Sequence, residues 1–179
     1  ERVHFILFSV YIIFVALMNT IIVEGGKDMG NRIYPIGIQN FEKIRKEGYV
    51  YVDKTALMYK LVKSGSYYFL SRPRRFGKSL LISTLEAYFE AKRDLFEGLA
   101  VETLEKDWVK RPVFHLDLNI GKYDTPDSLD KILNETLDYW ESLYGTRSAE
   151  TTLALRFAGV VGRAYEQSGE RVAILIDEY

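Results

Sequence analysis

The sequence predicts an α/β protein with a three-layer α/β/α core and a mainly parallel sheet. Short apolar runs of strand character alternate with segments in which apolar residues recur at helical spacing, a pattern typical of parallel strands joined by helices. Two of these runs are followed by residues that could bind a ligand or act in catalysis. A basic Gly-Lys-Ser loop follows one run, and two acidic residues end the other. Because the chain ends directly after the second run, we expect the core to be truncated at its carboxyl end.

The first of these runs is residues 67–79, YYFLSRPRRFGKS. It predicts a strand, a tight basic loop, and a helix that begins around Lys78 and Ser79, which is the order of a phosphate-binding loop. In such a loop the backbone N–H groups face an anion, the lysine reaches the outer phosphates and the serine hydroxyl binds Mg²⁺. Arg72 stands where the general consensus has its first glycine, and an ordinary basic turn at the start of a helix is the alternative.

The second run is residues 172–178, VAILIDE, which predicts a strand buried on both faces with two acids at its carboxyl end. In a P-loop NTPase core, Asp177 would hold the magnesium shell and Glu178 would polarise the attacking water. The alternative is a core strand that ends in solvated acids. Taken together, the two motifs favour a nucleotide site in which Lys78 and Glu178 are catalytic and Ser79 and Asp177 bind the metal.

Two longer segments carry a family resemblance: YPIGIQNFEKIRKEGYVYVDKTALMYKLV, residues 34–62, and YYFLSRPRRFGKSLLISTLEAYF, residues 67–89. Both resemble the predicted AAA-ATPase-like family of bacterial P-loop proteins, in which RPRRFGKS is the usual form of the loop. The resemblance implies ATP and Mg²⁺ as cofactors and a nuclease-like domain of the PD-(D/E)xK type as a possible C-terminal partner. It also implies which residues contact the nucleotide: Arg74, Arg75, Phe76, Gly77, Lys78, Ser79 and Leu80.

Three roles are open for Arg74 and Arg75: phosphate contact, contact with nucleic acid, or simple solvation. The net charge of −1 gives no support to nucleic acid as a general partner. The absence of cysteine and the presence of only two histidines exclude disulfides and argue against a zinc site. The sequence gives no indication of an oligomeric state.

Residues 1–28 are expected to lie outside the fold, and residues 29–179 to form the N-terminal part of the ATPase-like domain. Residues 5–23 are almost unbroken apolar sequence, long enough to span a membrane. Met29 directly precedes the family-like segment, so residues 1–28 are either translated upstream sequence or a genuine anchor. The first reading predicts a cytoplasmic protein, and the second a membrane-anchored one.

Between the motifs, periodicity and turn residues predict further elements. Asp53 is expected to cap the helix that follows it, although the Asp-Lys-Thr motif of residues 53–55 is typical of the resembling family and can instead face the nucleotide. Asp117 ends a strand and can face the nucleotide as well. The expected strands are residues 49–52 and 113–118, and the expected helices are residues 41–47, 54–63, 80–90, 125–144 and 153–167.

The leading function is therefore an ATP-binding ATPase domain that hydrolyses ATP with Mg²⁺. One alternative is a module that binds nucleotide without hydrolysis and switches a partner domain, which Arg72 in place of glycine favours because glycine allows backbone angles that arginine resists. Another is the ATPase part of a nucleic-acid-processing protein.

Overall fold

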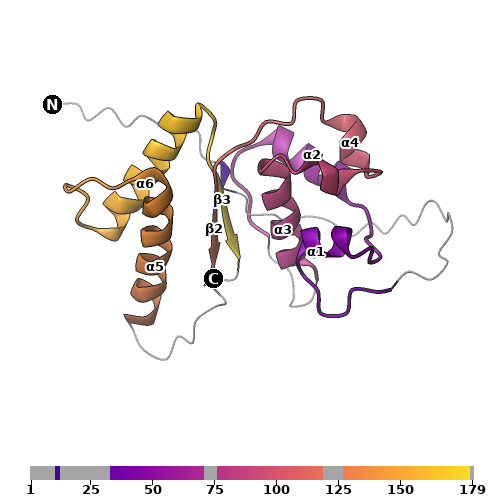
Figure 1. Ribbon diagram of the computed structural model, residues 1–179, viewed down its shortest axis with the longest axis horizontal. Coiled ribbons are helices and arrows are strands. Elements are labelled where there is room, and N and C mark those ends of the chain that lie inside the picture. The colour runs from indigo at the N-terminus through magenta and orange to yellow at the C-terminus, as the bar shows by residue number, and fades with distance from the viewer. Residues whose placement is uncertain (1–10, 13–32, 71–75, 119–126, 178–179) are drawn as a thin grey trace. The chain divides into compact units, whose positions relative to one another are not determined.

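The computed structural model has an α/β fold with helices and a small parallel sheet (Figure 1). It divides into two compact units, residues 1–12 with 110–179, and residues 13–109, and each is described by itself. The described residues are 11–12, 33–70, 76–118 and 127–177.

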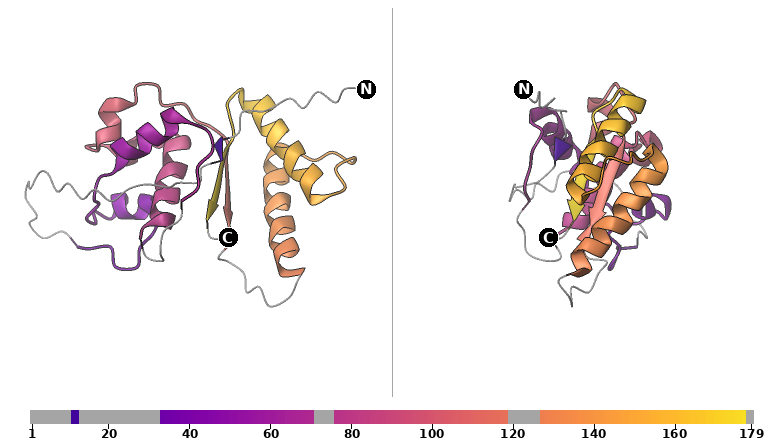
Figure 2. Two further views of the ribbon diagram at one scale, coloured as in Figure 1. Left: turned by 180° about the vertical axis from the view of Figure 1, so that it is seen from behind. Right: turned by 90° about the vertical axis from the view of Figure 1, so that its left-hand side faces the viewer.

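The first unit is built on three parallel strands in the order β1-β3-β2. β2 (Val113–Asp117) and β3 (Ala173–Asp177) pair along their full length, from Val113 opposite Ala173 to Asp117 opposite Asp177. Parallel neighbours need a crossover connection, and here it contains α5 (Asp127–Tyr144) and α6 (Leu153–Ser168). Both helices lie on the same side of the β2–β3 pair in the two opposite views of Figures 1 and 2.

An apolar cluster joins these helices to one face of the sheet. At its centre the rings of Phe114 and Trp140 stack, with centroids 4.5 Å apart and planes 10° from parallel. Removing this apolar surface from water is the main favourable contribution to the packing of the unit. The cluster contains Phe114, Leu137, Trp140, Val160, Val161, Ala164, Val172 and Ile174.

The ends of α6 follow from its sequence. The Thr152 hydroxyl accepts a hydrogen bond from the Leu155 N–H at the start of the helix. At the other end Gly169 has a φ of 70°, which glycine adopts without steric cost, and its N–H donates to the Tyr165 carbonyl. The predicted helix at residues 153–167 is thus confirmed.

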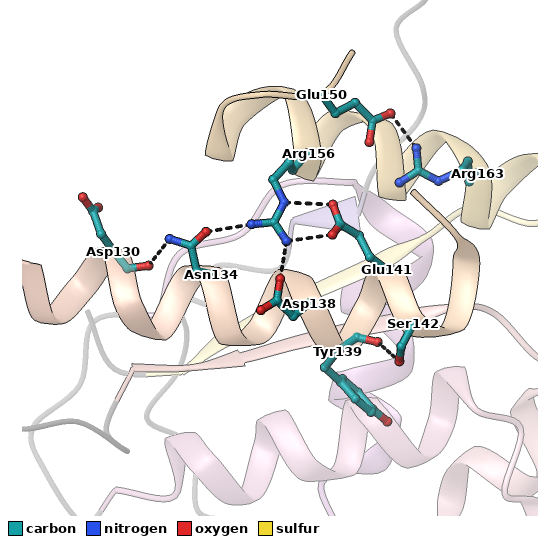
Figure 3. Close-up of polar contacts among 9 residues, drawn as sticks. All are labelled: Asp130, Asn134, Asp138, Tyr139, Glu141, Ser142, Glu150, Arg156 and Arg163. Atoms are coloured by element: carbon teal, nitrogen blue, oxygen red, sulfur yellow. Dashed lines mark hydrogen bonds and ion pairs between the residues drawn. The ribbon is translucent and has the colours of Figure 1, made fainter. Parts of the chain in front are cut away.

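Arg156 joins α6 to α5 through a single guanidinium group (Figure 3). Its Nε and Nη2 donate to the two oxygens of Glu141 at 3.0 and 2.7 Å, Nη2 also donates to Asp138 at 2.5 Å, and Nη1 donates to Asn134 at 2.7 Å. Asn134 is held in turn by the Asp130 carbonyl. The hydrogen bonds to Glu141 and Asp138 raise the pKa of Arg156, so its guanidinium group is charged at any physiological pH.

A second ion pair connects α6 to the loop before it. Arg163 Nη1 lies 2.5 Å from Glu150 Oε1, and both side chains are largely buried (Figure 3). Arg163 Nε and Nη2 and Glu150 Oε2 are buried with no hydrogen-bond partner. The Glu150 carboxylate lies so close to Gly159 that a Cβ atom there would overlap it. Glycine at position 159 therefore makes room for the ion pair.

We predict that Gly159→Ala destabilises the protein by roughly 3 kcal/mol, because the added methyl group displaces Glu150 and leaves Arg163 buried without its partner. Gly162→Ala in the same helix is the matched control. A Cβ at Gly162 meets no atom within 4 Å, so this change should stabilise by about 0.5–1 kcal/mol through helix propensity. Urea unfolding measures both, and equal effects of the two changes would contradict the prediction.

The second unit is helical in its described part. It contains α1 (Phe41–Lys46), α2 (Thr55–Ser64), α3 (Lys78–Phe89), a 3-10 helix η1 (Arg93–Phe96) and α4 (Ala100–Leu104). Its core contains a chain of aromatic contacts: Tyr88 of α3 meets Phe96 of η1 and Trp108 after α4, and Phe96 in turn meets Phe41 of α1. The rings involved are Phe41, Tyr88, Phe89, Phe96 and Trp108.

Polar contacts fix α1 against the segment after α3. Arg45 donates to the carbonyls of Leu95 and Glu97 at 2.7 and 2.6 Å. Glu42 accepts from Lys46 at 2.6 Å and from Lys92 at 2.8 Å. These hydrogen bonds lower the pKa of Glu42 to about 2, so its charge persists in mild acid.

Two predicted strands are wrong. Residues 49–52 form no strand, because their backbone donors are used elsewhere: Tyr49 N–H donates to the Ile44 carbonyl and Val50 N–H to the Ile33 carbonyl. In the run before the basic loop, Tyr67 makes a single bridge and residues 68–70 have no regular structure. Strand propensity describes a residue that fits a pleated sheet, and tertiary context decides whether a sheet partner is present.

The structure also departs from the expectation for residues 1–28 at two positions. Tyr11 and Ile12 form β1, which pairs in parallel with Ala173 and Ile174 of β3. This pairing occurs because β2 occupies only one edge of β3. The backbone N–H and C=O groups along the other edge of β3 are able to pair with another strand. The other residues of 1–28 lie outside the described ranges. Among the residues that are described, no helix is both long and apolar enough to cross a bilayer.

Candidate functional site

The start of α3 carries the centre of the predicted phosphate loop. Gly77 precedes the helix with φ 75° and ψ 25°, in the left-handed region of backbone angles that residues other than glycine rarely adopt. Lys78 and Ser79 are the first two residues of the helix, and the Leu81 N–H donates to the Gly77 carbonyl. The prediction of a helix that begins at Lys78 and Ser79 is confirmed.

The N-cap residue of this helix is Gly77, which has no side chain with which to cap it. The first N–H groups of an α-helix have no acceptor within the helix, and together with the helix dipole they favour a negative charge. At α6 the hydroxyl of Thr152 meets this need, whereas Gly77 offers no side chain. The start of α3 therefore has the chemical character that anion binding requires.

Two other predicted loop residues lie beside this turn. The Phe76 side chain is 62% exposed, whereas Leu80 is partly buried in the helix. Arg74 and Arg75 lie outside the described residues, as does Arg72. Their predicted roles stay predictions.

The carboxyl end of β3 carries the predicted metal ligand. Asp177 is the last residue of the strand and is largely buried. Asp117 ends β2 and is its register partner, so the two aspartates lie side by side at the carboxyl edge of the sheet. Open parallel sheets bind ligands at that edge. Glu178, the predicted water-polarising residue, lies outside the described residues.

The two halves of the predicted site belong to different units: Lys78 and Ser79 to residues 13–109, and Asp177 to residues 110–179. Within the described residues, no group of three or more His, Asp or Glu side chains could hold a metal ion by itself.

The Asp-Lys-Thr motif has a structural role that the sequence left open. Asp53 Oδ1 accepts from the N–H and the hydroxyl of Thr55 at 2.8 and 2.6 Å, and Oδ2 accepts from the Ala100 N–H at 2.7 Å. The buried Thr55 hydroxyl also accepts from the Val101 N–H at 3.0 Å. Asp53 and Thr55 thus bind the starts of both α2 and α4. This favours the capping role over a nucleotide contact, and no sequence signal pointed to α4.

The other end of α3 is anchored by a buried carboxylate. Glu105 accepts hydrogen bonds from the Tyr88 hydroxyl and from the Asp107 N–H, and Lys63 Nζ lies 3.0 Å away. Burial acts to raise the pKa of Glu105, but the hydrogen bonds from Tyr88, Lys63 and Asp107 outweigh it and lower that pKa. Glu105 therefore stays charged while it joins α2, α3 and the end of α4.

This arrangement predicts a loss of stability in acid. The pKa of Glu105 is lower in the folded protein than its ordinary 4.5, so its contribution is present above pH 4.5 and lost as the pH falls through the folded value. Glu105→Gln should cost about 1–3 kcal/mol at pH 7 and flatten the pH dependence below 4.5. Denaturant midpoints across this range measure it. Glu135→Gln, at a 66% exposed side chain, should change little, and equal slopes for all three proteins would refute the assignment.

Comparison with known proteins identifies the family of this chain. The family model described as "Predicted AAA-ATPase" matches residues 35–179. The chain belongs to this predicted AAA-ATPase family. Family membership supports ATP binding and an ATPase-like function at a coarse level, on an α/β fold.

One curated relative is an "Uncharacterized protein in vnfD 5'region" of Azotobacter chroococcum mcd 1. The two are 40% identical over 153 residues, which cover 84% of this chain and 30% of that protein. The chain therefore spans less than a third of the length of this relative. No solved structure matches the chain.

Proposed function

We propose that this AAA-ATPase family member is an ATPase domain on a three-layer P-loop core, which binds ATP with Mg²⁺ at the start of α3 and hydrolyses it. The observation that carries the proposal is the start of α3, where a left-handed glycine leads directly into Lys78 and Ser79. Family membership supports ATP as the nucleotide. Asp177, at the carboxyl edge of a parallel sheet, is the proposed metal ligand.

Each residue would have a separate task in binding. The N–H groups of the first turn of α3 would donate to phosphate oxygens, and the Lys78 ammonium would offset their negative charge. Arg74 and Arg75 would add further phosphate contacts. Because α3 packs in the core of its unit, with Tyr88 against Phe96 and Trp108, these donors would be held in place before the substrate arrives.

The protein's donor set suits magnesium. The Ser79 hydroxyl and the Asp177 carboxylate are hard oxygen ligands, and Mg²⁺ bound to a nucleotide takes only one or two ligands from the protein. When bound, the ion neutralises charge on the phosphates. Glu178 would accept a hydrogen bond from the water that attacks the terminal phosphorus and so orient it.

Lys78→Ala tests the binding half of the site. We expect ATP affinity to fall by roughly 10- to 150-fold, the loss that follows removal of a charged hydrogen bond. Isothermal titration of the intact protein with Mg-ATP measures it. Lys60→Ala, at an exposed lysine of α2, is the control and should bind normally. If both variants bind ATP as the unmodified protein does, α3 is not the phosphate site.

Glu178→Gln tests the hydrolytic half. Glutamine keeps the shape of the side chain but is a far weaker base, so ATP binding should persist while phosphate release falls by about 10²- to 10⁴-fold. Titration and a phosphate-release assay on the same preparation separate the two effects. If the unmodified protein binds ATP tightly yet releases no phosphate, the chain is a nucleotide-gated switch and the hydrolytic role fails.

A further inference from the structure

The exposed side of α6 is apolar along most of its length. Leu155 and Tyr165 are 50% and 39% exposed, and Ala158 between them is exposed as well. Gly162 completes the line, and a Cβ atom built there would meet no atom within 4 Å. These four residues, Leu155, Ala158, Gly162 and Tyr165, are called the outer stripe below.

A helix at the surface of a protein usually turns charged side chains towards solvent. The neighbouring α5 does so with Lys131, Glu135 and Asp138, whose side chains are 78%, 66% and 71% exposed. In α6, all of whose residues the structure describes, both arginines are used in ion pairs inside the unit. Glu166, near the end of the helix, is its one exposed charged residue. Apolar residues on opposite sides are typical of a helix that is covered on both.

The outer stripe has the spacing of a contact between two helices. Its residues follow one another at intervals of three, four and three, which places them in one line along the helix. The two large side chains lie at the ends of this line, and the two small residues lie at its centre. Small residues at a contact let two helix axes approach to the short end of the usual range, about 8–10 Å. The stripe therefore fits a second helix.

The order of sizes fits a second copy of α6. Large, small, small and large is the same order in both directions, so the outer stripe is symmetric about the middle of the helix. A two-fold axis at that point makes an isologous contact, in which the same surface of each copy is used. In an antiparallel pair, Leu155 would face Tyr165 of the second copy, and Ala158 would face Gly162 of the second copy. The stripe contains no charge that would meet its own copy across the axis.

The charges at the ends of α6 favour the antiparallel direction. The helix has no acidic residue in its first turn and no basic residue in its last turn, so its own terminal residues do not compensate its dipole. Glu166 is paired with Arg147 of the preceding loop at 3.7 Å, which offsets its charge. An antiparallel copy places the positive end of each helix beside the negative end of the other. A parallel copy would place like ends together.

We propose that the outer stripe of α6 is an interface between two copies of this chain, which pair antiparallel about a two-fold axis between Ala158 and Gly162. The interface does not involve the proposed nucleotide site. A contact between two helices of 16 residues is small, whereas stable complexes bury roughly 1,200 Å² or more. The dimer is therefore weak, with a dissociation constant of roughly 10 μM or above.

Analytical ultracentrifugation of the intact protein, below and above this concentration, measures the association. Ala158→Glu puts a charge next to its own copy at the centre of the stripe and should weaken association by about tenfold or more. Ala149→Glu, at an exposed alanine of the loop before α6, is the matched control and should associate like the unmodified protein. Because Ala158 is exposed, its substitution should leave the thermal unfolding of the dilute protein unchanged, which separates a lost interface from a lost fold.

Cross-linking tests the direction of the pair, because the chain has no cysteine of its own. Leu155→Cys and Tyr165→Cys proteins are mixed at high concentration and treated with a short bismaleimide reagent. The mixture should cross-link, whereas each variant alone should cross-link far less, since like positions lie about 15 Å apart along an antiparallel pair at 1.5 Å per residue. A monomer at every concentration, association that Ala158→Glu leaves unchanged, or efficient cross-linking of each variant to itself would overturn the inference.

Discussion

The first turn of a helix has N–H groups that the helix itself cannot satisfy, and at α3 the residue in the N-cap position is a glycine. Gly77 adopts the left-handed backbone angles that lead into the helix, and it has no side chain that could accept from those N–H groups. At α1 and α6 the same need is met within the protein, by Asn40 and Ser83 in one and by Thr152 in the other. Among these three helices, α3 is the one whose start suits an external anion.

Other residues of the second unit contact α3 at its middle and near its end. Tyr88 near the end of the helix meets Glu105, while Ser83 in the middle meets α1. Aromatic rings of α1 and η1 fill the space between. A helix held this firmly loses little freedom when it binds a ligand, because its order is established by folding. Asp117 and Asp177 are positioned by the register of the two parallel strands that they end, and α5 and α6 pack on those strands.

The sequence predicted the elements whose signal is local. Helical spacing located α3, α5 and α6, and the apolar runs before Asp117 and Asp177 located β2 and β3. The strand predictions for residues 49–52 and 67–70 were wrong, although both segments are rich in residue types that favour strands. The N–H groups of Tyr49 and Val50 donate to residues outside a sheet, and residues 67–70 make a single bridge at Tyr67. The contacts of Asp53 with Ala100, and of Phe41 with Ser83, join residues more than forty positions apart. Nothing in local periodicity encodes such contacts.

Arg156 has a consequence for how the first unit comes apart. Its three acceptor side chains, Asn134, Asp138 and Glu141, recur along α5 at helical spacing, so they converge on one guanidinium only while two turns of that helix are intact. Fraying of α5 at this level would leave a charged group of α6 without its counter-ions. The two helices should therefore unfold as one cooperative unit.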